Sequence, residues 1–158
     1  MLLAIYLNDH LAGATGGLEL AKRAAASNRD TTHGPLLQRL AGEIEEDRET
    51  LLEIMRTLGV RVDRIKVLAG WGAEKLGRLK LNGRVRGYSP LSRVVELEGL
   101  TLGVHGKRAL WHTLAELQPA PAGLAAFDLA ALITRAEAQL QELEQHRRQS
   151  AAAAFVGA

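Results

Sequence analysis

The sequence predicts an all-α fold, a four-helix bundle with one additional helix, on three observations. The composition is 47% hydrophobic but only 4% aromatic, so leucine and alanine must form most of the core, as is typical of helical proteins. Apolar side chains recur at three- and four-residue intervals through four long segments. Two short loops and one long connection join these segments. A chain of 158 residues corresponds to a single domain that covers residues 1–158.

Recognisable signals mark where the predicted helices begin and end. Pro35 suits the first turn of the second helix, and Gly59 ends that helix. Ser89 and Pro90 form an N-cap and first-turn pair for a later helix. The expected helices are about 2–27, 35–58, 60–81, 90–117 and 126–152.

The lengths of the connections predict how these helices run. The first and second helices are joined by a short loop, as are the last two, so each pair is antiparallel. The connection between the pairs has about thirty residues, and a helix of about twenty residues within it spans roughly 30 Å, the length of the bundle. The order is then up-down-down-up. This layout resembles that of the ferritin-like superfamily over nearly the whole chain.

Polar side chains are expected in the interior of this bundle. The predicted register places His10, Asp47 and His105 near its middle, with Glu43 and Glu98 about two turns from His105. Glu98 and His105 stand seven residues apart, so both are expected on the buried stripe of their helix. An unpaired buried carboxylate costs several kcal/mol. Each of these acids therefore needs a partner.

Two interpretations supply the partners. In the first, the side chains bind a single divalent metal, because carboxylate and imidazole suit iron, manganese or zinc, and the ferritin-like resemblance implies a metal at mid-bundle. The candidate ligands are His10, Glu43, Asp47, Glu98 and His105. In the second, the acids pair with the two protonated histidines and with Arg108, and no cofactor is needed. The Glu-x-x-His signature of the superfamily does not occur in the sequence, which argues against a two-metal oxidase site.

Positive charge is concentrated between residues 61 and 86. Eight Lys and Arg stand there against two acids, a balance of +6 in a chain of formal charge +2. The alternative function is therefore a metal-free bundle that acts as a scaffold or binding protein, with the basic crossover 61–86 contacting an anionic partner or nucleic acid. The candidate anion-binding residues are Arg78, Lys80, Arg84 and Arg86.

Glycines within the predicted helices have two interpretations. They are Gly13, Gly16, Gly17, Gly42, Gly99, Gly103 and Gly106. Each costs up to about 1 kcal/mol relative to alanine, so each needs a reason. Close contact between helices or subunits is the favoured one, and room for a ligand is the other. A Gly- and Ala-rich helix face also suits a homo-oligomer.

The remaining expectations concern environment. The chain has no cysteine, which excludes disulfides and thiolate metal sites and fits a cytoplasmic location. Its apolar runs fall short of the roughly 18–20 residues of a membrane span, so no membrane partner is expected. His33 and His146 are expected to face solvent. Catalytic activity is left undecided by these patterns.

Overall fold

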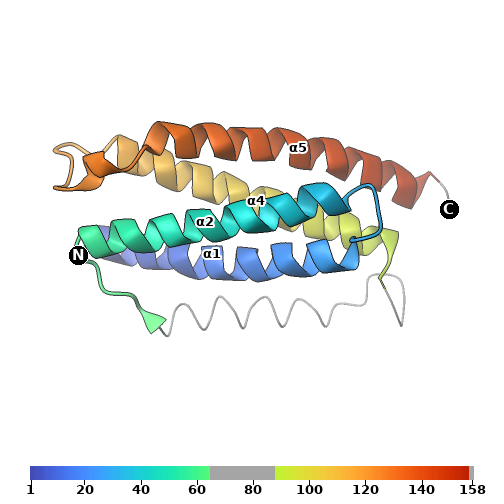
Figure 1. Ribbon diagram of the computed structural model, residues 1–158, viewed down its shortest axis with the longest axis horizontal. Coiled ribbons are helices and arrows are strands. Elements are labelled where there is room, and N and C mark those ends of the chain that lie inside the picture. The colour runs from blue at the N-terminus through green and yellow to red at the C-terminus, as the bar shows by residue number, and fades with distance from the viewer. Residues whose placement is uncertain (65–87, 157–158) are drawn as a thin grey trace.

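The computed structural model describes residues 1–64 and 88–156, and there the protein is an all-α bundle (Figure 1). Its helices are α1 (Leu2–Ser27), α2 (Gly34–Thr57), α4 (Pro90–Ala115), the short 3-10 helix η1 (Leu124–Ala126) and α5 (Leu129–Phe155). No β-strand occurs in these two ranges. The predicted fold class is confirmed, and the predicted bounds of the four long helices agree within three residues. Most of the helix expected over about 60–81 lies outside the described residues.

Figure 1 shows the path of the chain through the bundle. α1 and α2 form one antiparallel hairpin, and α4 and α5 form another. α2 ends where α1 begins, whereas α4 begins at the opposite end, so α4 runs parallel to α2 and antiparallel to α1. α1 packs against both α2 and α4, α5 packs against α4, and α2 and α5 make little direct contact. The up-down-down-up order is therefore as predicted.

The ends of the helices follow local chemistry. The Ser89 hydroxyl accepts a hydrogen bond from the Ser92 N–H at 3.1 Å, which caps α4 as predicted. The Asp128 carboxylate caps α5 in the same way, accepting from the Ala131 N–H at 2.9 Å. Gly59 follows α2 with φ of 67°, a left-handed conformation that glycine adopts without a Cβ clash.

Two apolar clusters fill the interior, and a polar layer separates them. One cluster includes Leu37, Leu40, Leu97, Leu100 and Leu143. The other includes Leu7, Leu11, Ile54, Trp111 and Leu114. A fully buried leucine contributes about 1.5–3 kcal/mol to folding, so these clusters supply much of the driving force. Asp47 on α2 and Lys107 on α4 lie between the clusters along their helices.

Candidate functional site

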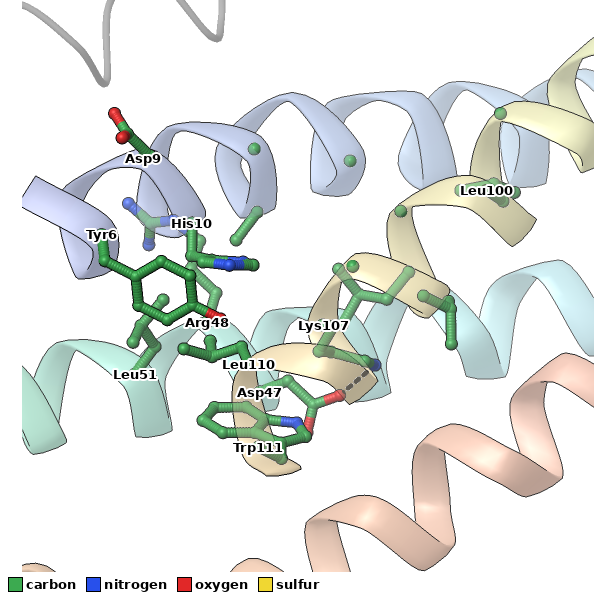
Figure 2. A pocket seen from close by; sticks show the side chains of 18 residues that line it. Tyr6, Asp9, His10, Asp47, Arg48, Leu51, Leu100, Lys107, Leu110 and Trp111 are labelled. Carbon is green, nitrogen blue, oxygen red and sulfur yellow. Dashed lines mark hydrogen bonds and ion pairs between the residues drawn. The ribbon is translucent and has the colours of Figure 1, made fainter. Parts of the chain in front are cut away.

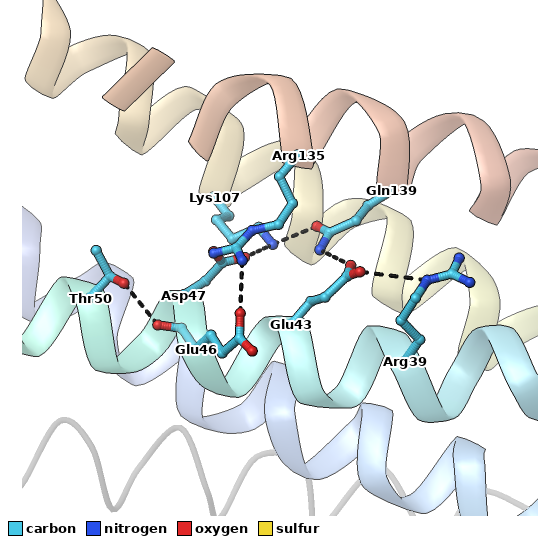
Figure 3. Close-up of polar contacts among 8 residues, drawn as sticks. All are labelled: Arg39, Glu43, Glu46, Asp47, Thr50, Lys107, Arg135 and Gln139. Atoms are coloured by element: carbon cyan, nitrogen blue, oxygen red, sulfur yellow. Dashed lines mark hydrogen bonds and ion pairs between the residues drawn. The ribbon is translucent and has the colours of Figure 1, made fainter. Parts of the chain in front are cut away.

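Asp47 is the centre of the polar layer between α2, α4 and α5 (Figure 3). Its side chain is 3% exposed, and its carboxylate accepts hydrogen bonds from Lys107 Nζ and Arg135 Nη2. Gln139 Oε1 accepts from Lys107 Nζ at 2.6 Å, and Gln139 Nε2 donates to Glu43 at 2.7 Å. Charge-assisted hydrogen bonds, which are among the strongest in proteins, therefore join the three helices.

Ion pairs extend this layer towards the surface. Arg135 Nη1 donates to Glu46 at 2.8 Å, and Arg39 pairs with Glu43 at 3.5 Å and with Glu142. Burial lowers the pKa of Lys107, a shift that the neighbouring carboxylates partly oppose. The space between α2 and α5 is thus bridged largely by ion pairs.

The prediction that Glu98 and His105 are buried is wrong. The Glu98 side chain is 52% exposed and lies 3.8 Å from Arg147, and His105 is exposed as well. The buried face of α4 is rotated by about one residue, or 100°, from the predicted stripe. It consists of Val94, Leu97, Leu100, Val104, Leu110, Trp111 and Leu114. This rotation buries leucines and a tryptophan and leaves a carboxylate and an imidazole in water, which avoids their desolvation cost.

The five predicted metal ligands are not gathered at one place. Glu43 and Asp47 lie in the polar layer, whereas His10 packs edge-on against Tyr6, with ring centroids 4.5 Å apart. Within residues 1–64 and 88–156, no three His, Asp or Glu side chains are close enough to hold a metal ion. Both Asp47 oxygens already accept from cations, so these residues do not fit a divalent ion. Binding of iron or manganese stays a prediction that elemental analysis of the purified protein can test.

The ion-pair interpretation agrees better with this geometry, although with different cations. Asp47 pairs with Lys107 and Arg135, where His10, His105 and Arg108 were expected. Lys107 could have been found from the sequence, because it lies between Val104 and Trp111 on the apolar stripe of α4. Arg135 is next to the buried Ala136 of α5 in the sequence, and no local signal identifies its partner.

A cavity of about 440 Å³ lies between α1, α2 and α4, beside the polar layer (Figure 2). Its lining is mostly apolar and includes Ile44, Leu51, Leu100, Val104, Leu110 and Trp111. Glycines of two facing helices form much of the remaining wall: Gly13, Gly17, Gly99, Gly103 and Gly106. We refer to this space as the glycine-lined cavity. The polar side chains in its wall are Tyr6, Asp9, His10, Asp47, Arg48 and Lys107.

The favoured interpretation of the helix glycines is close contact between helices or subunits, but contact between the described helices of this chain is absent at five of them: Gly13, Gly17, Gly42, Gly103 and Gly106. Contact between subunits stays a prediction. A Cβ built on Gly13, Gly17, Gly103 or Gly106 meets no described atom within 4 Å. At Gly99, by contrast, a Cβ would lie 3.0 Å from Leu20 Cδ2. The missing side chains at the other four cavity positions therefore leave open space.

The wall of the glycine-lined cavity also contains an unsatisfied donor. Trp111 is 1% exposed, and its Nε1 has no hydrogen-bond partner among the described residues. A buried N–H without an acceptor costs about 1–3 kcal/mol.

A second cluster of polar side chains lies where α2 begins, and it corrects the expectation that His33 faces solvent. His33 is 6% exposed, and its Nδ1 lies 2.9 Å from Nδ1 of the partly buried His146. Its Nε2 lies 3.4 Å from the Ser150 hydroxyl. One imidazole must donate to the other across the short Nδ1–Nδ1 contact, so the contact requires at least one neutral ring.

We expect this histidine pair to make the fold sensitive to acid. Burial lowers the pKa of both rings, and the charge of Arg93 lowers that of His33 further. The folded protein therefore binds fewer protons than the unfolded chain, and stability present above about pH 6.5 is lost as the pH falls below it. In thermal melts at pH 7.5 and pH 5, His146→Gln should lose less stability on acidification than the wild type does. The exposed His105→Gln is the control, and equal acid sensitivity in all three proteins would contradict the prediction.

Other predicted features lie outside the part of the chain that the structure describes. Arg78, Lys80, Arg84 and Arg86 belong to residues 65–87, so contact of the basic crossover with nucleic acid or another anion stays a prediction. So does the homo-oligomer, since the structure is of one chain. None of the described helices combines the length and apolar character that crossing a membrane requires.

Comparison of the chain with protein-family models, with curated proteins and with solved structures finds no match. The function must therefore be argued from the geometry of the polar layer and the cavity.

Proposed function

We propose that this protein is a binding protein for a small, elongated and mainly apolar ligand, held in the glycine-lined cavity. The observation that carries the proposal is the open space in front of Gly13, Gly17, Gly103 and Gly106. Glycine inside a helix is destabilising relative to alanine by about 1 kcal/mol. Four such residues around one cavity therefore favour a role for the space itself.

The size and shape of the cavity indicate the kind of ligand. Residues 6–17 of α1 and 99–111 of α4 line it, and segments of that length extend roughly 16–18 Å along a helix. An engineered cavity of about 150 Å³ in another protein holds benzene. A space of about 440 Å³ thus suits a ligand on the order of fifteen non-hydrogen atoms. Transfer of its apolar surface from water would drive binding.

The ferritin-like resemblance is the second part of this proposal. The up-down-down-up order and the long connection after α2 support a distant relation to that superfamily. The interior region that holds metal there corresponds here to the layer around Asp47, which is held by Lys107 and Arg135. Binding would then have moved from a metal in the layer to an organic molecule beside it.

Filling the cavity tests the proposal. Gly103→Leu places a side chain in the open space, and Gly42→Leu is a matched control, because Gly42 is also a helix glycine with no neighbour within 4 Å but does not line the cavity. Both substitutions raise helix propensity. We would titrate each protein with N-phenylnaphthylamine, an uncharged apolar fluorophore, and follow its emission.

The wild type and Gly42→Leu should bind the fluorophore saturably, with about one site per chain. Gly103→Leu should bind it at least about tenfold more weakly, equivalent to about 1.4 kcal/mol. Absence of saturable binding by the wild type, or unchanged binding by Gly103→Leu, would overturn the proposed function.

A further inference from the structure

Arg48 distinguishes one end of the glycine-lined cavity from the other. Its side chain reaches from α2 to α1, where Nε donates to the Thr15 hydroxyl at 3.2 Å. Among the described residues, no carboxylate forms an ion pair with this guanidinium. The group is partly buried, so its charge is screened less than that of a fully exposed arginine. Its two terminal nitrogens are available to an anion.

The side chains around Arg48 lie where they can contact the same end of a ligand. Figure 2 shows Tyr6, His10 and Arg48 together at one end of the cavity, with Leu100 near the other. Burial lowers the pKa of His10, and a neutral imidazole still offers one N–H donor. Arg48 and His10 can therefore both donate to an acceptor at this end of a ligand, whereas the Tyr6 hydroxyl already donates to Thr113 Oγ1 at 3.2 Å.

The other charged side chains of the wall are already engaged. Lys107 donates to Asp47, and Asp47 also accepts from Arg135. Asp9 is not free either, and its charge acts on the neighbouring His10. Arg48 is therefore the charged group of the described wall that a ligand can neutralise.

We propose that the ligand is an organic monocarboxylate with an elongated apolar body, a deepening that rests on the proposed function. The carboxylate binds the guanidinium of Arg48 at the end where His10 lies, and the apolar body extends past the glycines towards Leu100. A guanidinium and a carboxylate can form two parallel hydrogen bonds, which fix the orientation of the ligand in addition to the attraction between the charges. An alkyl chain of about twelve carbons fits both the length and the volume of the cavity.

Two ligands that differ only in the head group test this assignment. Dodecanoic acid and dodecanol have the same chain, and calorimetric titration at neutral pH, below their aggregation thresholds, gives both affinities. The proteins are the wild type, Arg48→Gln, and Arg48→Lys, which keeps the charge without the planar fork. Arg148→Gln is the control for loss of a positive charge, because Arg148 is exposed and pairs with Glu144 on the same helix.

The wild type should bind the acid at least about tenfold more tightly than the alcohol. Arg48→Gln should bind the acid about tenfold or more weakly than the wild type does, while its affinity for the alcohol changes less than about twofold. The affinity of Arg48→Lys for the acid should lie between those of the wild type and Arg48→Gln. Arg148→Gln should match the wild type. Arg48→Gln also removes a hydrogen bond to α1, so far-ultraviolet circular dichroism is used to check that each variant is folded. If Arg48→Gln does not fold, Arg48→Lys still tests the assignment, because it should weaken binding of the acid more than binding of the alcohol.

The failures of the two proposals are distinguishable. If the wild type binds the neutral fluorophore and the alcohol but shows no preference for the acid, the carboxylate assignment is wrong and the proposed function stands. The assignment is also wrong if Arg48→Gln lowers the affinities for the acid and for the alcohol equally. If none of the three compounds binds, the proposed function itself is overturned.

Discussion

Replacing Asp47 by leucine is expected to lower the free energy of unfolding by about 3–5 kcal/mol, the range observed when one partner of a buried ion pair is removed. The carboxylate is 3% exposed and accepts from both Lys107 and Arg135. Without it, the buried ammonium of Lys107 keeps only the amide oxygen of Gln139. Denaturation by urea, followed by circular dichroism, measures the loss.

Two comparisons separate burial of charge from loss of packing. The double variant Asp47→Leu/Lys107→Met replaces both charges by apolar groups and should recover most of the lost stability, because no uncompensated ammonium remains near Gln139. Glu45→Gln disrupts an exposed pair, with Lys22 at 2.7 Å, and should change stability by less than about 1 kcal/mol. A loss of under about 1 kcal/mol in Asp47→Leu would contradict the central role of the polar layer.

The arrangement of the helices could be predicted from the sequence because it depends on local signals. Ser89 and Pro90 start α4, Gly59 follows α2, and the connection lengths decide which helices run parallel. None of these signals requires knowledge of a distant contact. The fold class and the helix bounds were therefore accessible from composition, periodicity and turn chemistry alone.

The rotation of α4 was less accessible, because its sequence contains two competing stripes. One includes Glu98 and His105 with aliphatic neighbours, and the other includes Leu97, Val104 and Trp111. The spacing of residues is compatible with either. The difference lies in the desolvation cost of a carboxylate and an imidazole, set against the apolar area that the second stripe buries.

The partners of Asp47 and the purpose of the glycines depend on register between helices. Arg135 stands 88 residues from Asp47 in the chain, so a helix shift of one turn would separate them. Likewise, a glycine that permits close packing and one that leaves a space look identical in sequence. Gly99 and Gly103 illustrate this, since an added Cβ would be crowded at the first and free at the second.

The polar layer and the cavity are connected through their shared wall. Asp47 and Lys107 belong to both, and Arg48 is the basic group of the described wall that forms no ion pair with a described carboxylate. A carboxylate ligand would pair with the Arg48 guanidinium without disturbing the ion pairs that hold α2, α4 and α5 together. Binding and stability are then separable, and substitutions at Arg48 and Asp47 should affect different measurements.

Trp111→Ala is expected to lower the free energy of unfolding by about 3–5 kcal/mol, because it removes a large, fully buried side chain from the second apolar cluster. Trp111→Phe should cost less than about 1.5 kcal/mol, since a ring still fills much of the space and the unsatisfied Nε1 donor disappears. Chemical denaturation of the three proteins gives both differences. If phenylalanine proves as damaging as alanine, the indole N–H makes a stabilising contact in the folded protein, and its assignment as an unsatisfied donor is wrong.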